Sequence, residues 1–485
     1  MESKSLPKNI DYSDVLPQSV PAIARRRKFY SSNGANFSFG GSRDIRIDIQ
    51  SVNSMLDTTH SYLEFVIENK NAAGATFGAD VGGGAVFFDT LRIEQGGRVL
   101  SECQEFNRFN SAILSPAQES HQGQITQSLT GMNRAMNAVG AGVGGYVGLA
   151  ANGLNGDTYG NCKHNGDNVL APGAKYRFTM PVLSGLFTQD KLLPLPLLKQ
   201  GNPLTIVLTC ANPEDTGVWS AQPASTDLEV ISIHYNAQLI EVGRDVIEQV
   251  KTMQGMMGGQ IAISGQDYEH QQGVIPAASD GEQLIRIPSR KKSIKSLLFM
   301  IQSDTFANGA GGMARWNRYN LSFAGTANVT KYQLKVGSVV YPPQPVEGFF
   351  SFVDEEFKRG ESIMELSKAL GTLGFKNPSG RLNTITYGLD TAGMATGDTG
   401  AAGANLAPGT NDVTCFCPFG LDLDSFQHTA IEGGVDTQTL GLESNLSLEI
   451  EAGQNSGVQA KNVHCYVVFD QHYYFGMDGL ITFAN

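Results

Sequence analysis

Two short patterns in this 485-residue sequence could bind a nucleotide or carry out acid–base chemistry. The run GAGVGG at 140–145 fits the G-x-G-x-x-G pattern, whose glycines let backbone amides approach a phosphate. No strand pattern precedes the run and no clear helix follows it, so we do not predict a nucleotide site. Asp354, Glu355 and Glu356 form an acidic run, which the electrostatics of a helix start explains as well as catalysis does.

Histidine and cysteine side chains are the other candidates for chemistry. His464, Cys465 and His472 are metal-ligand types, but alternation along a strand sends His464 and Cys465 to opposite faces. Cys415 and Cys417 would share a face, but two ligands do not complete a metal site. The sequence has no G-x-S-x-G nucleophile motif and no P-loop. We therefore predict no catalytic residue, no cofactor and no metal site, and we expect that the protein is not an enzyme.

A basic cluster, Arg25, Arg26, Arg27 and Lys28, contrasts with a chain of formal net charge −12. Residues 1–34 carry six Lys or Arg and three Asp or Glu, so the rest of the chain is acidic and a poor nucleic-acid binder. Prolines at positions 7, 17 and 21 discourage regular structure, which predicts an N-terminal arm. At an anionic surface, such a cluster gains about 1 kcal/mol per charge.

The elements that would carry these residues follow the same order twice. The first half predicts strands at 44–51 and 61–69, a Gly-rich loop at 71–85, a hairpin at 86–100, a helix at 103–114, a long loop at 115–172, and strands at 175–182, 203–212 and 228–242. The second half predicts strands at 282–289 and 293–304, a Gly-rich loop at 306–314, a hairpin at 329–342, a helix at 362–374, a long loop at 391–412, and strands at 414–426, 445–452 and 462–475. A period of ~230 residues indicates domain duplication, because solenoid repeats are far shorter.

About eight short strands per half is the count of a jelly roll or sandwich. We therefore predict an all-β fold of two tandem eight-stranded jelly rolls, with one short helix per roll and long surface loops. The predicted boundaries are an arm at 1–34, a first roll at 35–243, a linker at 244–262 and a second roll at 263–485. Apolar spacing in the linker predicts a short amphipathic helix that ends before Gly258-Gly259.

Composition excludes other classes of protein. No apolar run approaches the ~18 residues of a membrane-spanning helix, and the start MESKSLPKNIDYS lacks the apolar segment of a secretory signal. Six cysteines scattered through a long chain indicate free thiols in a reducing compartment.

Two stretches carry a family resemblance. The run SGLFTQDKLLPLPLLKQGNPLTIVLTCAN at 184–212 resembles the passage from a Gly-Leu-Phe turn through a Leu/Pro-rich segment into a strand of the first roll in double jelly-roll major capsid proteins. The hairpin LRIEQGGRVL at 91–100 fits the same pattern. These proteins build the shells of tailless icosahedral double-stranded DNA viruses and include adenovirus hexon and the virophage and polinton-like virus proteins. The resemblance covers about residues 35–480 as a pattern, without a short unique motif.

The resemblance implies a structural function in the virion. Three copies would form a pseudo-hexagonal block, and such blocks would tile an icosahedral shell around the genome. Implied partners are the protein itself in trimers and neighbouring trimers, together with penton and minor capsid proteins. Assembly would take place in the cytoplasm or nucleus of the host cell. The loops at 115–172 and 391–412 would project as towers or clasp a neighbouring subunit; otherwise they are plain surface loops.

The basic cluster then has several interpretations. Arg25, Arg26, Arg27 and Lys28 would contact the inner face of the shell, where the arm meets an internal membrane, the genome or a neighbouring trimer. A solvated tail and a nuclear-import signal are the alternatives. A rival hypothesis for the whole chain is a carbohydrate-binding or carbohydrate-active β-sandwich protein, since jelly rolls serve both classes. With Trp219 and Trp316 as its only tryptophans, the chain offers few aromatic platforms for sugars. A third hypothesis is a penton protein. The duplication argues against it, because penton proteins usually have a single roll.

Overall fold

The computed structural model describes most of both halves of the chain. The described residues are 22–41, 43–75, 77–79, 83–114, 170, 172–189, 191–219, 223–276, 281–303, 324–325, 329–347, 350–351, 356–357, 359–370, 414–415, 418–425, 433–439, 446–452 and 460–484. Within them, no helix is long and apolar enough to span a membrane.

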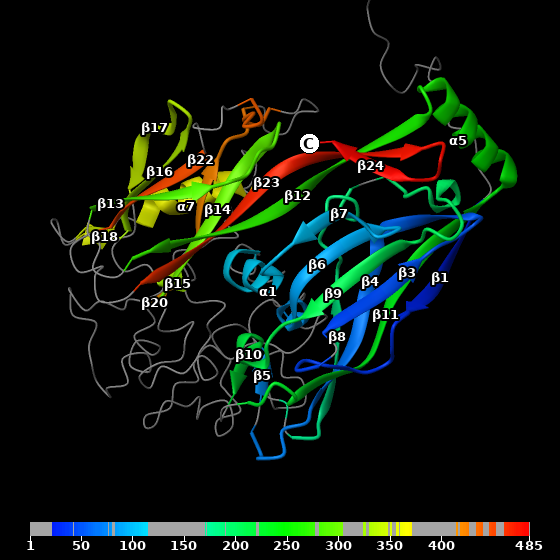
Figure 1. Cartoon of the computed structure of the whole chain (residues 1–485), viewed down its shortest axis with the longest axis horizontal. Coiled ribbons are helices and arrows are strands. Elements are labelled where there is room, and N and C mark those ends of the chain that lie inside the picture. Colours follow the sequence, from blue (N-terminus) through cyan, green and yellow to red (C-terminus); the bar gives the residue numbers. More distant parts are fainter. Residues whose placement is uncertain are drawn as a thin grey trace, which may run out of the picture.

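Among the described residues, the first half forms two facing antiparallel sheets, one of five strands and one of four (Figure 1). One sheet has the order β1 (Ala22–Tyr30), β11 (Leu228–Val242), β4 (Ser54–Asn69) and β8 (Lys175–Met180), with the short β2 (Phe37–Ser38) also on β11. The other has the order β3 (Asp44–Ile49), β9 (Leu204–Cys210), β6 (Phe88–Gln95) and β7 (Arg98–Cys103).

The second half repeats this topology strand for strand. One sheet has the order β12 (Gln260–Ile275), β23 (Lys461–Gly476), β14 (Ile294–Ser303) and β21 (Phe419–Asp422), with β24 (Ile481–Ala484) also on β23. The other has the order β13 (Gly281–Ile287), β22 (Leu446–Ala452), β16 (Val329–Val336) and β17 (Val339–Glu347). The predicted fold of two tandem eight-stranded jelly rolls is confirmed.

Helices and short strands complete the described part. They are η1 (Gly83–Phe87), α1 (Phe106–Arg108), η2 (Phe109–Leu114), η4 (Leu195–Leu197), η5 (Pro213–Asp215), α5 (Arg244–Met256) and α7 (Arg359–Ala369), and the strand pairs β5 (Phe77–Ala79) with β10 (Gly217–Trp219), β15 (Ala324–Gly325) with β20 (Thr414–Cys415), and β18 (Phe350–Ser351) with β19 (Glu356–Phe357). The predicted helices match α1 with η2, α5 and α7. Of the apolar side chains in α5, Ile247 is buried whereas Met253 is exposed.

The two predicted hairpins are confirmed as β6–β7 and β16–β17. Their turns need left-handed backbone: φ is 57° at Gly96, 85° at Gly97 and 63° at Gly337. Glycine adopts these angles without a Cβ clash, so the turn residues fix the pairing of each hairpin.

The two cores share an aromatic stack at the same place. Phe65 of β4 stacks on Phe178 of β8, with ring centroids 5.8 Å apart and an interplanar angle of 18°. Phe299 of β14 stacks on Phe419 of β21 at 5.0 Å and 17°. All four rings are fully buried. Because each pair is also a cross-strand pair, the two stacks mark equivalent positions in the two rolls.

Two strands differ from the sequence prediction. β1 lies within the predicted arm at 1–34 and pairs with β11 from Ala22 opposite Val242 to Tyr30 opposite His234, so the first roll begins before residue 35. β12 begins at Gln260, inside the predicted linker at 244–262. Both strands were missed because their burial does not follow the simple alternation that identifies a half-buried strand.

Candidate assembly surfaces

The seam between the rolls is centred on Asp267 of β12, which is only 2% exposed. Its carboxylate accepts hydrogen bonds from Ser101 Oγ at 2.8 Å, Tyr473 OH at 3.0 Å and the backbone N–H of Tyr268 at 3.1 Å. Burial raises the pKa of Asp267, although these hydrogen bonds favour its charged form. Because Ser101 lies in β7 of the first roll, this buried acid joins the two rolls.

Two glycines bring the backbones of the rolls together beside Asp267. A Cβ atom on Gly265 of β12 would lie 1.9 Å from the carbonyl oxygen of Gly185 in the first roll. Real Cβ atoms do not approach an oxygen so closely, so only glycine allows β12 to dock here.

Side-chain amides connect the seam to backbone groups. Gln95 at the end of β6 donates to Gly479 O at 3.0 Å and accepts from Ile481 N–H at 2.6 Å. Gln471 of β23 donates to Leu100 O of β7 at 3.0 Å. Each bond crosses from one roll to the other, so polar groups at the seam remain paired when they are buried.

An aromatic cluster packs in the seam beside Asp267. The ring of Phe109 lies 4.9 Å from that of Tyr268 and 4.7 Å from that of Tyr466, measured between centroids. The Tyr466 hydroxyl donates to the backbone oxygen of Glu105 at 2.9 Å. This contact joins η2 of the first roll to β12 and β23 of the second.

Buried ionisable groups lie behind this cluster. Arg108 forms ion pairs with Glu105 at 2.5 Å and Asp215 at 3.9 Å. His270 Nε2 lies 3.1 Å from His464 Nδ1. Burial lowers the pKa of His270 to about 4, and burial together with the charge of Arg108 lowers the pKa of His464. Both imidazoles are therefore neutral at pH 7.

We expect acid to loosen the seam. His270 binds a proton near pH 6.5 when unfolded but only near pH 4 when folded, so the free energy of unfolding falls as pH drops through that window, by up to about 3 kcal/mol. Arg108 and His464 oppose its protonation, and Glu105 favours it. Urea unfolding at several pH values should show a shallower dependence for His270→Gln than for the wild type.

The comparison of the wild type with His270→Gln separates the contribution of His270 to the pH dependence of stability from that of Asp89. Burial raises the pKa of Asp89 to about 6, so its contribution to stability is lost as pH rises, opposite in sign to that of His270. Asp89 is common to both proteins, so its contribution cancels in the comparison. Identical pH slopes for the wild type and His270→Gln would contradict the assignment to His270.

The predicted contact residues, Arg25, Arg26, Arg27 and Lys28, lie together on β1 at the edge of the first roll. Arg25 Nε is 3.2 Å from Glu241 Oε2 of β11. Arg26 donates to the Tyr62 hydroxyl at 2.6 Å. The sequence thus identified a true cluster but placed it in an arm, whereas it belongs to a sheet. Its contact with the inner face of a shell stays a prediction.

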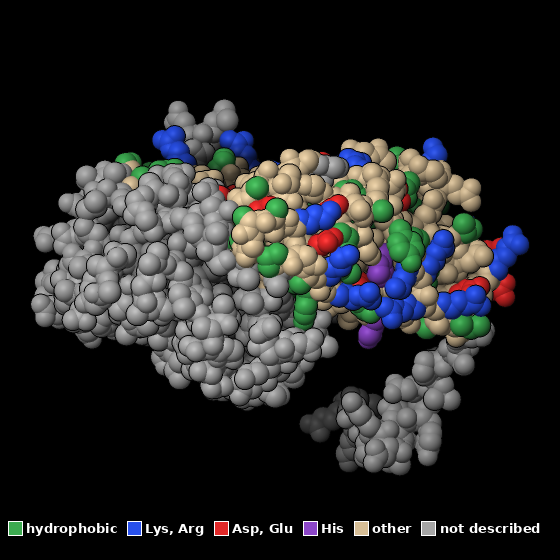
Figure 2. All heavy atoms as spheres, turned by 90° about the horizontal axis from the view of Figure 1, so that it is seen from below, with side chains coloured by type: hydrophobic (Ala, Val, Ile, Leu, Met, Phe, Trp, Pro, Cys, Tyr) green, Lys and Arg blue, Asp and Glu red, His purple; other side chains and the backbone are tan. Residues whose placement is uncertain are grey.

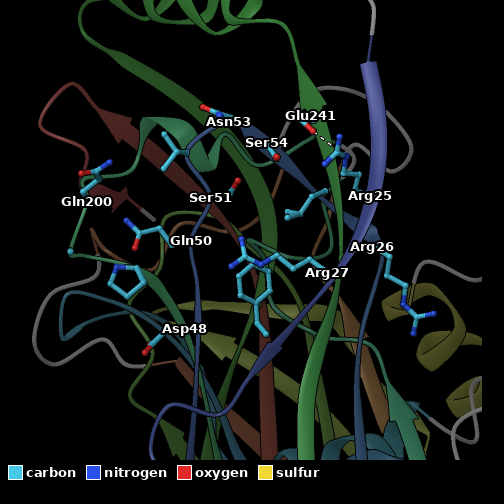
Figure 3. A pocket seen from close by; sticks show the side chains of 15 residues that line it. Arg25, Arg26, Arg27, Asp48, Gln50, Ser51, Asn53, Ser54, Gln200 and Glu241 are labelled. Atoms are coloured by element: carbon cyan, nitrogen blue, oxygen red, sulfur yellow. Dashed lines mark ion pairs between the residues drawn. The ribbon is translucent and has the colours of Figure 1, made fainter.

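A groove runs beside this cluster (Figure 3). β1 forms one wall with Arg25 and Arg27, and residues 50–54 with Gln200 and Pro203 form the other. The guanidinium of Arg27 lies 4.9 Å from the ring centroid of Phe29. The groove encloses about 1060 Å³.

On the outer face of the β1–β11–β4–β8 sheet, basic and polar side chains surround Glu64. Its carboxylate accepts from Arg177 at 2.6 Å and Asn236 at 2.7 Å, and Arg26 and His234 lie 3.8 and 3.5 Å away. Burial would raise the pKa of Glu64, but the Asn236 hydrogen bond and the nearby cations lower it. Figure 2 shows Lys and Arg side chains gathered on the side of the first roll seen from below.

Other sequence candidates do not form a site in the described part. His464 and Cys465 are both buried in β23, and no group of three His, Cys, Asp or Glu among the described residues could hold a metal ion. Cys417, the 140–145 run and the loop at 391–412 lie outside the described residues, as do Asp354, Glu355 and most of the loop at 115–172.

Sequence reasoning missed Gly265, Asp267 and His270, which all lie on β12. The one signal that could have identified them is the duplication itself. It could have done so only after β1 had been recognised as a strand, because β12 is the counterpart of β1 in the second half.

No family model and no curated protein matches the sequence, but solved structures match the fold. PBCV-1 VP54, fitted into a reconstruction of the virophage Sputnik, has a TM-score of 0.57 and 10% identity over 98% of this chain and 99% of its own. The Faustovirus major capsid protein has a TM-score of 0.53 and 8% identity over 94% of this chain and 91% of its own. A Sputnik virophage chain has a TM-score of 0.50 and 12% identity over 99% and 92%.

At such low identity the likeness concerns the fold. This chain has the fold of double jelly-roll viral capsid proteins, as the sequence pattern predicted.

Proposed function

We propose that the protein is a viral major capsid protein that assembles as homotrimers, and that these trimers tile an icosahedral shell. The observation that carries the proposal is the way the two rolls join. They have the same topology but contact each other through unlike surfaces: β12 and β23 of one against β7 and η2 of the other. A head-to-tail contact between similar units leaves one surface of each kind unused.

Such unused surfaces favour self-assembly. A heterologous contact generates a ring if its rotation closes and an open fibre if it does not. Three chains, each contributing two rolls, would close a ring of six similar units. The role is structural, so we propose no catalytic activity. The carbohydrate hypothesis is not favoured, because the similar structures described above are capsid proteins.

Further contacts belong to the same proposal. In the virion, trimers would meet neighbouring trimers together with penton and minor capsid proteins. The part of the N-terminal arm that precedes β1 would reach an internal membrane or the genome. Assembly in the host cytoplasm or nucleus completes the proposal.

Sedimentation of the purified protein tests the trimer. We expect a species of three times the 52.0 kDa chain mass, with a hexagonal outline in electron micrographs. An interface of this kind buries more than ~2,000 Å², so the trimer should persist at micromolar concentration. Monomers alone at that concentration would contradict the proposal.

A further inference from the structure

The duplicated core gives a residue-by-residue correspondence between the rolls. Ile233 of β11 pairs with Phe65, and Cys465 of β23 pairs with Phe299. Since Phe65 and Phe299 hold the same place in the two aromatic stacks, position 233 corresponds to position 465.

The correspondence extends to the edge strands. β1 pairs with β11 and β12 with β23 without any register shift, so Tyr30, opposite His234, corresponds to His270, opposite Tyr466. Counting back along both strands, the basic residues 25–28 correspond to residues 265–268.

These corresponding positions have opposite surroundings. Gly265, Asp267 and Tyr268 are in the seam, where they contact the first roll. On β1, by contrast, the side chains of Arg25 and Arg26 are 66% and 52% exposed. The surface of β12 is therefore covered by the first roll, whereas the corresponding surface of β1 is not covered by any described residue.

The grooves beside the two strands correspond as well. In the second roll, a groove lined by Asp267 and Gln471 is closed by residues 99–102 of β7 from the first roll. The groove in Figure 3 is lined by Arg27 and Leu239, which occupy the matching positions. Among the residues that line it, none comes from the second roll.

The strand that corresponds to β7 is β17. Each is the second strand of a hairpin that follows a glycine turn, and each lies at the edge of its sheet. On and near β17, Val339 is 51% exposed and Met364 of α7 is 48% exposed. Glu347 at the end of β17 lies beside the exposed Glu361 of α7, because the backbone N–H of Glu347 donates to a carboxylate oxygen of Glu361 at 3.0 Å. The described part of this surface thus offers exposed apolar side chains and two neighbouring carboxylates, where β1 is basic.

We propose that residues 25–28 and the adjoining groove bind β17 and α7 of a second copy of this chain. This inference rests on the proposed trimer and names the surfaces that join its subunits. Each intermolecular seam would repeat the geometry of the seam within the chain, with Arg27 in the place of Asp267. Intramolecular and intermolecular seams would then alternate around the ring.

Cysteine cross-linking tests the geometry directly. Ser101 of β7 pairs with Ile93, the second residue before the last of β6, and its counterpart on β17 is Tyr341, which pairs with Leu334 at the same place in β16. Since Ser101 contacts Asp267, Arg27 should lie beside Tyr341 of the next copy. Under mild oxidation, the double variant Arg27→Cys/Tyr341→Cys should yield covalently linked trimers in a denaturing gel, whereas each single variant should not.

A charge-reversal pair gives an independent readout. Arg25→Glu/Arg27→Glu should raise the concentration at which trimers dissociate by at least about tenfold, because it turns attraction to the acidic surface into repulsion. The matched control, Arg244→Glu/Lys251→Glu on the exposed face of α5, makes the same charge change at residues that do not line the groove and should leave dissociation unchanged.

The outcomes separate the two proposals. Wild-type trimers that neither cross-link through positions 27 and 341 nor weaken on charge reversal would overturn this inference and leave the capsid function standing. A monomeric wild type would overturn the proposed function itself. Cross-linked trimers with selective weakening by Arg25→Glu/Arg27→Glu would support both.

Discussion

Gly265→Val should undock the two rolls of the chain. A Cβ at this position would lie 1.9 Å from Gly185 O, and that oxygen belongs to backbone that cannot rotate away as a side chain could. Overpacking of this kind typically costs about 1–3 kcal/mol, and we expect the upper end or beyond because the obstacle is main chain on both sides. Urea unfolding of the variant should show two separated transitions, one for each roll.

Gly41→Ala is the matched control. Its nearest neighbour would be 4.0 Å from the new Cβ, and its φ is not in the left-handed region. Its stability should stay within about 0.5 kcal/mol of the wild type, as for most exposed substitutions. If Gly265→Val unfolds in a single transition at the wild-type midpoint, the close approach of Gly185 and Gly265 is not essential to the seam.

Asp267→Ala should be the most damaging polar substitution at the seam. It leaves the hydroxyls of Ser101 and Tyr473 buried without their acceptor, and each unsatisfied buried group costs about 1–3 kcal/mol. Relief of the desolvation that raises the pKa of Asp267 offsets part of this loss. The net decrease in the free energy of unfolding should be about 3 kcal/mol, measured by urea unfolding at pH 7.

A double-mutant cycle with Ser101→Ala assigns this loss to the contact between the rolls. The coupling free energy should exceed about 0.5 kcal/mol, because the two residues share a hydrogen bond. Glu248→Ala serves as control: its exposed ion pair with Arg244 should contribute at most about 0.5 kcal/mol. Additive effects of Asp267→Ala and Ser101→Ala would show that the carboxylate stabilises β12 without joining the rolls.

Capsid assembly links these variants to the proposed function. If the intramolecular seam is the template for the intermolecular one, a chain whose rolls do not dock cannot present two rolls at the angle that closes a ring. Gly265→Val should therefore lose trimers as well as stability. The charge reversal on β1 should mainly affect trimers, because the Arg25–Glu241 ion pair that it also breaks is exposed and contributes little to stability.

The sequence by itself determined the local elements and their repetition. Glycines at 96–97 and 337 predicted two hairpins, apolar spacing predicted the helices, and alternation predicted most strands. All of these signals are local, because backbone angles and one-sided burial leave a pattern within ten residues. The order of the signals was enough to predict two jelly rolls.

Only the tertiary structure determined what β1 and β12 do. The strands that pair with β1 and β12 lie more than 160 residues away in the chain, as does the partner of Asp267 in its hydrogen bond with Ser101. Neither strand has a simple burial alternation: β1 lies at an exposed edge, and both faces of β12 are partly covered. From the sequence alone, a polar side chain such as Asp267 is predicted to be exposed. Only the tertiary structure shows that it is buried and bonded to donors of both rolls. The seam, and the basic surface that corresponds to it, therefore depended on long-range packing that leaves no local pattern in the sequence.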